Sequence, residues 1–187
     1  MTLIMTETLD LSATLEDQIQ ALDYTKLCPS NIAMAYRSRL LEGKLTRDEN
    51  AVSHFCVYFL PYDAKARKVF IGHHKKANLW LAPGGHIDAG ENINQAAGRE
   101  VFEELGLKIS SEHVGVPFLL TITQINNPPH LCKSHFDIWI VLGMAAQVFP
   151  GSLAEFHETG WLQIGEAKKL VTDPANLLAL EAVVEYT

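Results

Sequence analysis

The sequence predicts an α/β or α+β sandwich, in which a mixed β-sheet is covered by helices. Two observations carry this prediction. Short apolar, β-rich runs begin at Val52, and segments with helical spacing precede, interrupt and follow them. Strands that alternate with helices in this way form layered domains around one core. The length of 187 residues and the hydrophobic content of 48% suffice for one such domain with an extension before it.

The N-terminal region is predicted to be helical from residue 11 to residue 43. Apolar residues recur there at helical spacing, at Leu15, Ile19 and Leu22. Pro29 interrupts the pattern before a second helical segment, Asn31–Leu41, and the polar stretch 42–50 is predicted to be a connector. We therefore expect residues 1–50 to form a helical extension and residues 51–187 to form the main domain.

The strands of the main domain are bounded by turn residues. The first β-rich run is expected to end at Leu60 and to be followed by a turn over residues 61–68. Further strands are predicted at residues 69–73, 79–81, 117–125, 136–142 and 161–164. Helices are predicted over Ile93–Leu105, closed by Gly106, and over residues 167–170 and 175–186.

Three glutamates cluster in the predicted helix Ile93–Leu105. Glu100, Glu103 and Glu104 stand at positions i, i+3 and i+4, so they share an arc of roughly 100° on the helix surface. Like charges on one face repel one another, and a multivalent cation would offset that repulsion. Carboxylate oxygens suit Mg²⁺ or Mn²⁺ rather than zinc, and Mg²⁺ leaves positions for water and phosphate oxygens. The cluster therefore predicts a metal site for phosphate chemistry.

The opposite side of this helix is apolar and is expected to pack on the sheet, through Ala96, Ala97, Val101, Phe102 and Leu105. The glutamates would then face a cleft. The glycines before the helix, Gly84, Gly85 and Gly90, allow the backbone to turn sharply or to approach a ligand. Arg99 is expected to pair with Glu91 and to hold the glycine-rich loop against the helix.

The segment from Gly85 to Leu107 resembles the Nudix box. That signature is Gly, five residues, Glu, seven residues, Arg-Glu, an aliphatic residue, one residue, Glu-Glu, one residue, Gly and an aliphatic residue. Every fixed position is filled, by Gly85, Glu91, Arg99, Glu100, Val101, Glu103, Glu104, Gly106 and Leu107. The resemblance implies a Nudix-type α/β/α sandwich that cleaves a phosphoanhydride bond in a nucleoside diphosphate linked to another moiety.

The resemblance also implies roles for individual residues. The divalent ions, Mg²⁺ or Mn²⁺, would be bound by the three clustered glutamates and by the carbonyl of Gly84. Catalytic roles fall to Glu100, Glu103, Arg99 and Glu91, of which the last two would order the loop and the helix. The base that deprotonates the attacking water is left open, as one glutamate of the box or a carboxylate outside it.

Four residues are candidates for binding substrate: His86, His74, Lys76 and Asp137. His74 and Lys76 belong to a short basic run before the box, a pattern that fits phosphate binding and a solvated loop equally. Asp137 shares one face of a predicted strand with His135 by the two-residue period, and either a distal base or a structural role is open to it. The resemblance also makes Glu155 and Glu158, before Trp161, candidates for a further carboxylate that assists the site, and their role is left open.

Composition restricts the partners of the chain. The formal net charge of −7 argues against binding to duplex nucleic acid. No apolar stretch is long enough to span a bilayer, and the N-terminus lacks the features of a signal peptide, so no membrane partner is expected. The three cysteines are far apart and lack Cys/His zinc spacing, which indicates reduced thiols in the cytoplasm.

Two functions remain open from the sequence. The first is an active pyrophosphohydrolase with a small nucleotide or diphosphate substrate, and the second is a Nudix-fold binding or regulatory module without turnover. The complete set of box carboxylates favours the enzyme, because a binding module would be free to lose them. The substrate stays open among nucleoside triphosphates, modified nucleotides, sugar nucleotides and non-nucleotide diphosphates. The extension is expected either to cover the cleft or to form a homodimer interface.

Overall fold

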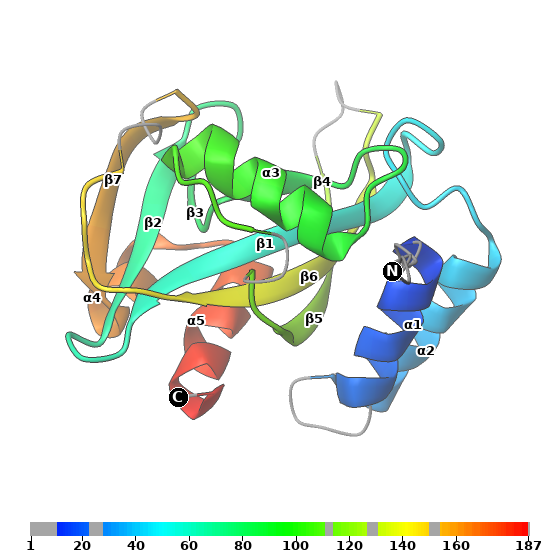
Figure 1. The fold of residues 1–187 in the computed structure, drawn as a ribbon, viewed down its shortest axis with the longest axis horizontal. Coiled ribbons are helices and arrows are strands. Elements are labelled where there is room, and N and C mark those ends of the chain that lie inside the picture. The colour runs from blue at the N-terminus through cyan, green and yellow to red at the C-terminus, as the bar shows by residue number, and fades with distance from the viewer. Residues whose placement is uncertain (1–10, 23–27, 111–113, 127–130, 150–153, 187) are drawn as a thin grey trace, which may run out of the picture.

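A seven-stranded mixed sheet forms the centre of the molecule (Figure 1). The structure, a computed structural model, describes residues 11–22, 28–110, 114–126, 131–149 and 154–186. The strands are β1 (Ser53–Asp63), β2 (Lys68–His74), β3 (Leu79–Leu81), β4 (Gly84–His86), β5 (Pro117–Gln124), β6 (Ser134–Gly143) and β7 (Phe156–Gln163). Their order is β3-β2-β1-β6-β5, with β4 paired to β1 and β7 paired to β2. The central pair, β1 and β6, is parallel, and its register matches His54 with His135 and Cys56 with Asp137.

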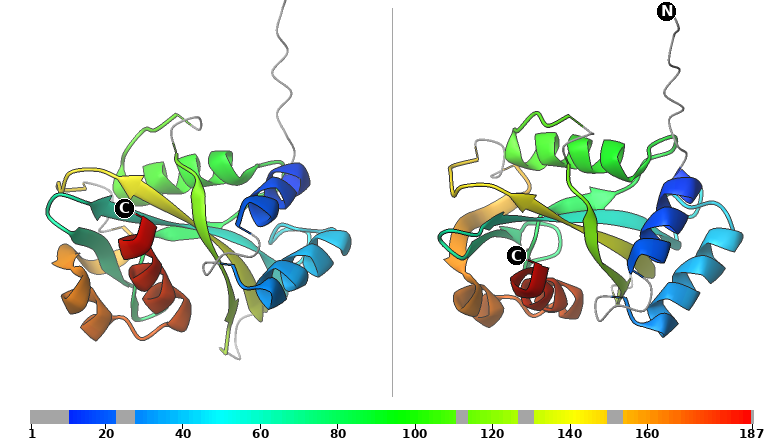
Figure 2. Two further views of the ribbon diagram at one scale, coloured as in Figure 1. Left: turned by 90° about the horizontal axis from the view of Figure 1, so that it is seen from below. Right: turned by 60° about the horizontal axis from the view of Figure 1, so that its bottom comes forward.

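Helices cover both faces of the sheet. Helix α3 (Ile93–Leu105) packs on one face through buried residues such as Ala97 and Val101. Helices α4 (Ile164–Leu170) and α5 (Pro174–Tyr186) pack on the other face, where Ala179 and Val183 join a second buried cluster. Figure 2 shows α3 on one side of the sheet and α4 and α5 on the opposite side. The predicted α/β/α sandwich is therefore confirmed.

The helical N-terminal extension is present as an antiparallel pair, α1 (Leu11–Leu22) and α2 (Ser30–Leu41), beside one end of the sheet (Figure 1). Leu15, Ile19 and Tyr36 are fully buried and belong to the same core as the strand residues beneath α3. The Tyr36 hydroxyl lies within hydrogen-bond distance of the carbonyl oxygens of Thr121 and Asp137, at 2.8 and 2.7 Å. The extension thus shares a core with the sheet, and the predicted domain boundary at residue 50 stays a prediction.

Two strand limits differ from the sequence prediction by three residues or more. Residues 61–63 continue β1 instead of forming a turn, and Pro61 falls between the parts of β1 that pair with β4 and with β2. A proline, which has no N–H, is tolerated where the ladder on one side is interrupted. The last strand begins at Phe156 and not at Trp161. Its first residues lack the apolar alternation of a strand, but hydrogen bonding to β2 holds them in the sheet. Ile164, predicted to end this strand, begins α4.

Among the described residues, no helix has both the length and the apolar character that a bilayer-spanning segment requires.

Candidate active site

Helix α3 is fixed at both ends by its own sequence. Asn92 caps the N-terminus, since its side chain accepts a hydrogen bond from the backbone of Gln95, whose side chain in turn accepts one from the backbone of Asn92. Gly106 ends the helix in the left-handed conformation, at φ 72°, where glycine has no steric penalty. These limits agree with the predicted helix Ile93–Leu105.

The faces of α3 differ from the prediction in one respect. Phe102 was expected to pack on the sheet but is 48% exposed, with the ammonium of Lys108 over its ring. By contrast, Glu100 and Glu104 are only 8% and 4% exposed. Both lie on the turns next to Ala97 and Val101, so the 100° step per residue brings them toward the sheet and turns Phe102 away. The carboxylates therefore sit at the border of the core and not opposite it.

The two buried carboxylates are held in an environment that disfavours their charge. Burial raises the pKa of Glu104 to about 9, and the charges of Glu100 and Glu155 add to this effect. Burial also raises the pKa of Glu100. In the described part of the chain, Glu104 has no ion pair with a lysine or arginine, and its recorded hydrogen bond is from the Gly84 N–H, at 2.7 Å. Burying carboxylates that have too few cationic partners costs free energy. A divalent cation bound between them would remove that cost.

Arg99 connects the loop before α3 with the glutamates of the helix. Its Nε and Nη2 atoms donate two hydrogen bonds of 2.8 Å to the carboxylate of Glu91, and Nη1 donates to Glu100 at 2.7 Å and to Glu103 at 3.3 Å. Nη2 also donates to the backbone carbonyl of His86 at 2.9 Å. The predicted pairing of Arg99 with Glu91 is confirmed by this geometry. Glu103 is the exposed member of the cluster, with its side chain 56% exposed.

The glycine pair in β4 allows the backbone to pass directly beside the carboxylates. A side chain at Gly85 would collide with the carboxylate of Glu100. Gly84 has a φ of 145° and lies so close to Tyr58 and the carbonyl of Val57 that no Cβ fits. The position of Gly84 therefore requires glycine, whereas a Cβ at Gly85 would force the Glu100 carboxylate to move; both positions place backbone polar groups next to Glu100 and Glu104.

A cavity of about 300 Å³ opens on the other side of β4, and the four residues predicted to bind substrate all line it. His74 and Lys76 contribute one part of the wall; Glu155 forms an ion pair with Lys76 at 3.4 Å, and its carboxylate lies 4.0 Å from Nε2 of His74. The charge of Glu155, one of the two candidates before Trp161, also contributes to the raised pKa of Glu104. Glu158, the other candidate, is exposed on β7.

Asp137 lies at the floor of this cavity and is fully buried. Its Oδ2 atom accepts hydrogen bonds from Thr121 at 3.1 Å and from Thr123 at 2.5 Å, whereas Oδ1 has no partner among the described residues. Burial raises the pKa of Asp137 to about 7. Beside it, the rings of Tyr58 and Trp139 stack at 4.9 Å, so an aromatic surface adjoins a buried acceptor. This combination suits a planar polar group such as a nucleobase.

Sequence reasoning missed a group of side chains at one end of this cavity. His54, His86, Cys132 and His135 converge there from β1, β4, the segment before β6, and β6. Burial lowers the pKa of His86 to about 3 and that of His135 to about 4, so both rings are neutral at physiological pH. The spacing of Cys132 and His135, with two residues between them, was the one local signal, because His54 and His86 join the group only through the pairing of β1 with β6 and with β4.

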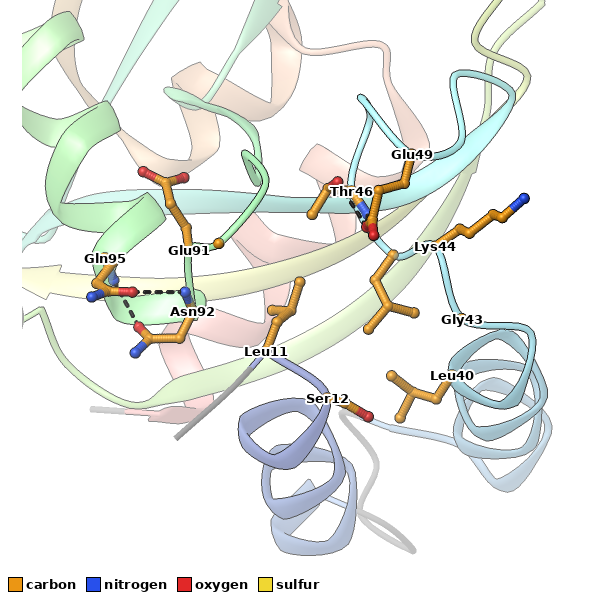
Figure 3. Close-up of a pocket in the computed structure, with 12 residues that line it drawn as sticks. Leu11, Ser12, Leu40, Gly43, Lys44, Thr46, Glu49, Glu91, Asn92 and Gln95 are labelled. Carbon is orange, nitrogen blue, oxygen red and sulfur yellow. Dashed lines mark hydrogen bonds between the residues drawn. The ribbon is translucent and has the colours of Figure 1, made fainter. Parts of the chain in front are cut away.

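A second, larger hollow of about 510 Å³ lies between the N-terminal helices and the loop that leads into α3 (Figure 3). The polar side chains in its walls already form hydrogen bonds with one another. Asn92 and Gln95 bond to each other on one side, and the Thr46 hydroxyl donates to Glu49 on the other. Glu91 borders the hollow, but its carboxylate is engaged by Arg99. The hollow therefore has fewer polar groups available to bind a ligand than the cavity beside β4 has.

The model of the NUDIX domain family matches residues 40–180. This match spans most of the chain, so the chain belongs to the Nudix family of hydrolases, as the resemblance of Gly85–Leu107 implied.

Individual relatives are more distant. The human protein "Nucleoside diphosphate-linked moiety X motif 6" is 30% identical over 112 residues, which cover 58% of this chain and 34% of the human protein. The chain thus spans about a third of the length of that relative. A Nudix-family hydrolase from Clostridium perfringens aligns with a TM-score of 0.55 and 23% identity over 72% of this chain and 98% of its own. The E. coli dihydroneopterin triphosphate pyrophosphohydrolase aligns with a TM-score of 0.52 and 21% identity, over 71% and 96%. At these identities the solved structures establish the fold alone.

Proposed function

We propose that this chain is a divalent-metal-dependent pyrophosphohydrolase that cleaves a phosphoanhydride bond in a nucleoside diphosphate linked to another moiety. The observation that carries the proposal is the pair of nearly buried carboxylates, Glu100 and Glu104, beside a cavity whose lining includes Lys76 and aromatic rings. Glu100, Glu103 and Glu104, with the carbonyl of Gly84, are the groups that would hold Mg²⁺ or Mn²⁺. When bound, such an ion neutralises phosphate charge and lowers the pKa of a water ligand.

The side chains of the chain itself supply orientation. Arg99 neutralises part of the charge on Glu91 and Glu100 and fixes the loop backbone through the His86 carbonyl. This network holds Glu100 in place before substrate arrives, and the Gly84 N–H holds Glu104, so little reorganisation accompanies the reaction. A box glutamate, or Glu155 outside the box, would accept the proton of the attacking water.

The lining of the cavity supports an orientation for the proposed substrate. The phosphates would lie toward Gly84, Gly85 and the carboxylates, with His74, Lys76 and His86 as neighbouring contacts. The remaining moiety would lie toward Asp137 and the stacked Tyr58 and Trp139 rings. The Oδ1 atom of Asp137, which has no partner among the described residues, is the acceptor that a base would engage. The printed name of the human relative, which refers to nucleoside diphosphate-linked moieties, is consistent with this class of substrate.

The proposal is tested by phosphate and pyrophosphate release from a panel of nucleoside triphosphates, modified nucleotides, sugar nucleotides and non-nucleotide diphosphates. Each reaction is run with Mg²⁺, with Mn²⁺ and with a chelator, and Glu104→Gln serves as the inactive control. We expect metal-dependent release from at least one compound and a loss of about 10²-fold or more in Glu104→Gln, which corresponds to roughly 3 kcal/mol. Tight binding of a nucleotide without turnover in any arm would instead favour the binding module.

Asp137→Asn examines the assignment of the cavity. The substitution keeps the volume of the side chain but replaces one acceptor atom with an amide donor. We expect a higher KM for the substrate identified on the panel, an altered preference among bases, and little change in the metal dependence. Identical KM values across the bases for the variant and the wild type would remove Asp137 from the substrate site.

A further inference from the structure

A group of four side chains outside the carboxylate cluster has the composition of a transition-metal site. His54, His86, Cys132 and His135 each offer one ligand atom, and these atoms all lie within 4.8 Å of one another. The three imidazole rings form a triangle, with centroid separations of 4.8, 5.1 and 5.2 Å. We propose that these four residues bind Zn²⁺, at a site separate from the carboxylate cluster. Three of them line the cavity beside β4, so His86 would ligate the zinc ion and not contact a phosphate.

The sheet itself brings these residues together. His54 of β1 is in register with His135 of the parallel strand β6, so the two rings project from the same face. His86 of β4 pairs with Cys56, two residues along β1 from His54, and therefore lies on that face as well. Cys132 closes the group from the segment before β6. Three of the four donors are thus fixed by strand pairing, which limits the reorganisation that metal binding requires.

The hydrogen bonds of the cluster leave lone pairs that a thiol proton cannot satisfy. The Sγ atom of Cys132 lies 2.7 Å from Nε2 of His135 and 3.3 Å from Nε2 of His54. A thiol has one proton, so it can donate to only one of these two nitrogens. The Nδ1 atom of His135 is buried without a partner among the described residues. A cation held by the sulfur and by one nitrogen of each ring would remove the competition of His54 and His135 for the thiol proton.

His54 has the second contact that metal-binding histidines typically make. Its Nδ1 atom lies 2.9 Å from the backbone carbonyl of Asn50, which can only accept a hydrogen bond. Nδ1 must therefore carry the proton, and the neutral ring presents the lone pair of Nε2 to the cluster. A backbone carbonyl that fixes the tautomer in this way is the usual partner of a zinc-ligating histidine.

The chemistry of the donors selects the ion. Three imidazoles and a thiolate are borderline-soft ligands, which prefer Zn²⁺ to the Mg²⁺ that suits carboxylates. Four protein ligands complete a tetrahedral shell, so the site is structural and not one that activates water. In such a shell, neighbouring donor atoms are roughly 3.3 to 3.6 Å apart, by the usual Zn–N and Zn–S distances. Rotation of the half-buried Cys132 side chain away from His135 would provide this spacing.

One contact opposes the ion and supplies a further test. The guanidinium of Arg47 lies 3.4 Å from Nδ1 of His86, and this exposed side chain would compete with a cation for the ring. Arg47→Ala removes the competing donor and a positive charge. It is therefore expected to bind Zn²⁺ more tightly than the wild type does.

The experiment measures metal content and not hydrolysis, so its outcome is independent of the proposed enzymatic function. The full chain is stripped with a chelator, equilibrated with Zn²⁺ in the presence of excess Mg²⁺, freed of unbound metal and analysed by elemental mass spectrometry. We expect a single zinc ion per chain in the wild type, and the same in Glu104→Gln. Substitution with Co²⁺ is expected to give visible d–d bands of a tetrahedral site and a sulfur-to-cobalt charge-transfer band.

Cys132→Ser and His135→Asn are the variants that test the ligands. Loss of a ligand should lower the Zn²⁺ affinity by more than the roughly 10- to 100-fold that loss of an outer partner costs. His157→Asn, at an exposed histidine outside the cluster, is the matched control and should bind as the wild type does. Wild-type protein without stoichiometric zinc, a cobalt spectrum without the sulfur band, or unchanged affinity in a folded Cys132→Ser variant would each overturn the proposal. If a variant does not fold, the wild-type cobalt spectrum decides the matter.

Discussion

The backbone N–H of Gly84 donates a 2.7 Å hydrogen bond to the carboxylate of Glu104, twenty residues further along the chain. This bond joins the glycine pair of β4 to the last turns of α3. It also places a single neutral donor against a carboxylate that is 4% exposed. The balance of charge at this point determines how the protein should respond to metal ions and to substitutions.

Mg²⁺ is expected to raise the melting temperature of the wild type and to leave that of Glu104→Gln unchanged. A ligand that binds only the folded state stabilises it by about 2.7 kcal/mol at a concentration of 100 times its Kd. Without metal, Glu104→Gln should melt above the wild type, because it removes the cost of a buried carboxylate that lacks a cation. Differential scanning fluorimetry with Mg²⁺ and with chelator measures both effects. A Glu104→Gln variant that gains as much from Mg²⁺ as the wild type would contradict the ligand assignment.

Arg99→Lys is expected to destabilise the fold by about 2 to 3 kcal/mol, although it conserves the charge. Lysine cannot make the two parallel hydrogen bonds to Glu91 while it also reaches Glu100 and the carbonyl of His86. Urea unfolding measures the loss. Arg37→Lys is the matched control, since the Arg37–Glu16 ion pair is on the surface and should change stability by less than about 1 kcal/mol. Equal effects of the two substitutions would show that the Arg99 network contributes no more than a surface pair.

Gly85→Ala is expected to lower kcat/KM by at least about tenfold, equivalent to roughly 1.4 kcal/mol, because its Cβ would displace the carboxylate of Glu100. The expected loss of stability is about 1 to 3 kcal/mol, as for other overpacked sites. Gly143→Ala provides the comparison, since a Cβ there meets no atom within 4 Å. Steady-state kinetics on the substrate found with the panel, together with thermal unfolding, separate the two effects. Full activity in Gly85→Ala would mean that Glu100 can move without consequence.

Tyr36→Phe is expected to cost about 1 to 2 kcal/mol of stability, because the buried carbonyls of Thr121 and Asp137 lose their shared donor from α2. Tyr62→Phe is a suitable control, since the Tyr62 hydroxyl makes no hydrogen bond within the described segments. Chemical denaturation of both variants measures the coupling of the N-terminal extension to the sheet. An unchanged midpoint in Tyr36→Phe would indicate that α2 can detach from the strands at little cost.

The carboxylate site could be predicted from the sequence because it is local. Glu100, Glu103 and Glu104 share one helix, so their relative positions follow from helical geometry and from the caps at Asn92 and Gly106. The pairing of Arg99 with Glu91 spans only the loop and the first turns of that helix. The motif was therefore sufficient to predict the family, the positions of the glycines and the pairing of Arg99 with Glu91.

Even within this helix, only the packed structure decided which side is buried. The prediction placed Phe102 in the core, although it is largely exposed, and left Glu100 and Glu104 facing a cleft, although both are nearly buried. Hydrophobicity alone cannot place a helix whose buried face includes charged groups, because the rotation of the helix is fixed by contacts with β1 and β4.

The cavity and the histidine–cysteine cluster were decided entirely by tertiary structure. Asp137 and His135 lie far along the chain from His54 and Cys56, and the parallel register of β1 with β6 sets them side by side. Parallel strands need a long crossover, so sequence spacing holds no record of which residues will be neighbours. The sequence by itself determined the chemistry of one helix, whereas long-range strand pairing determined what surrounds it.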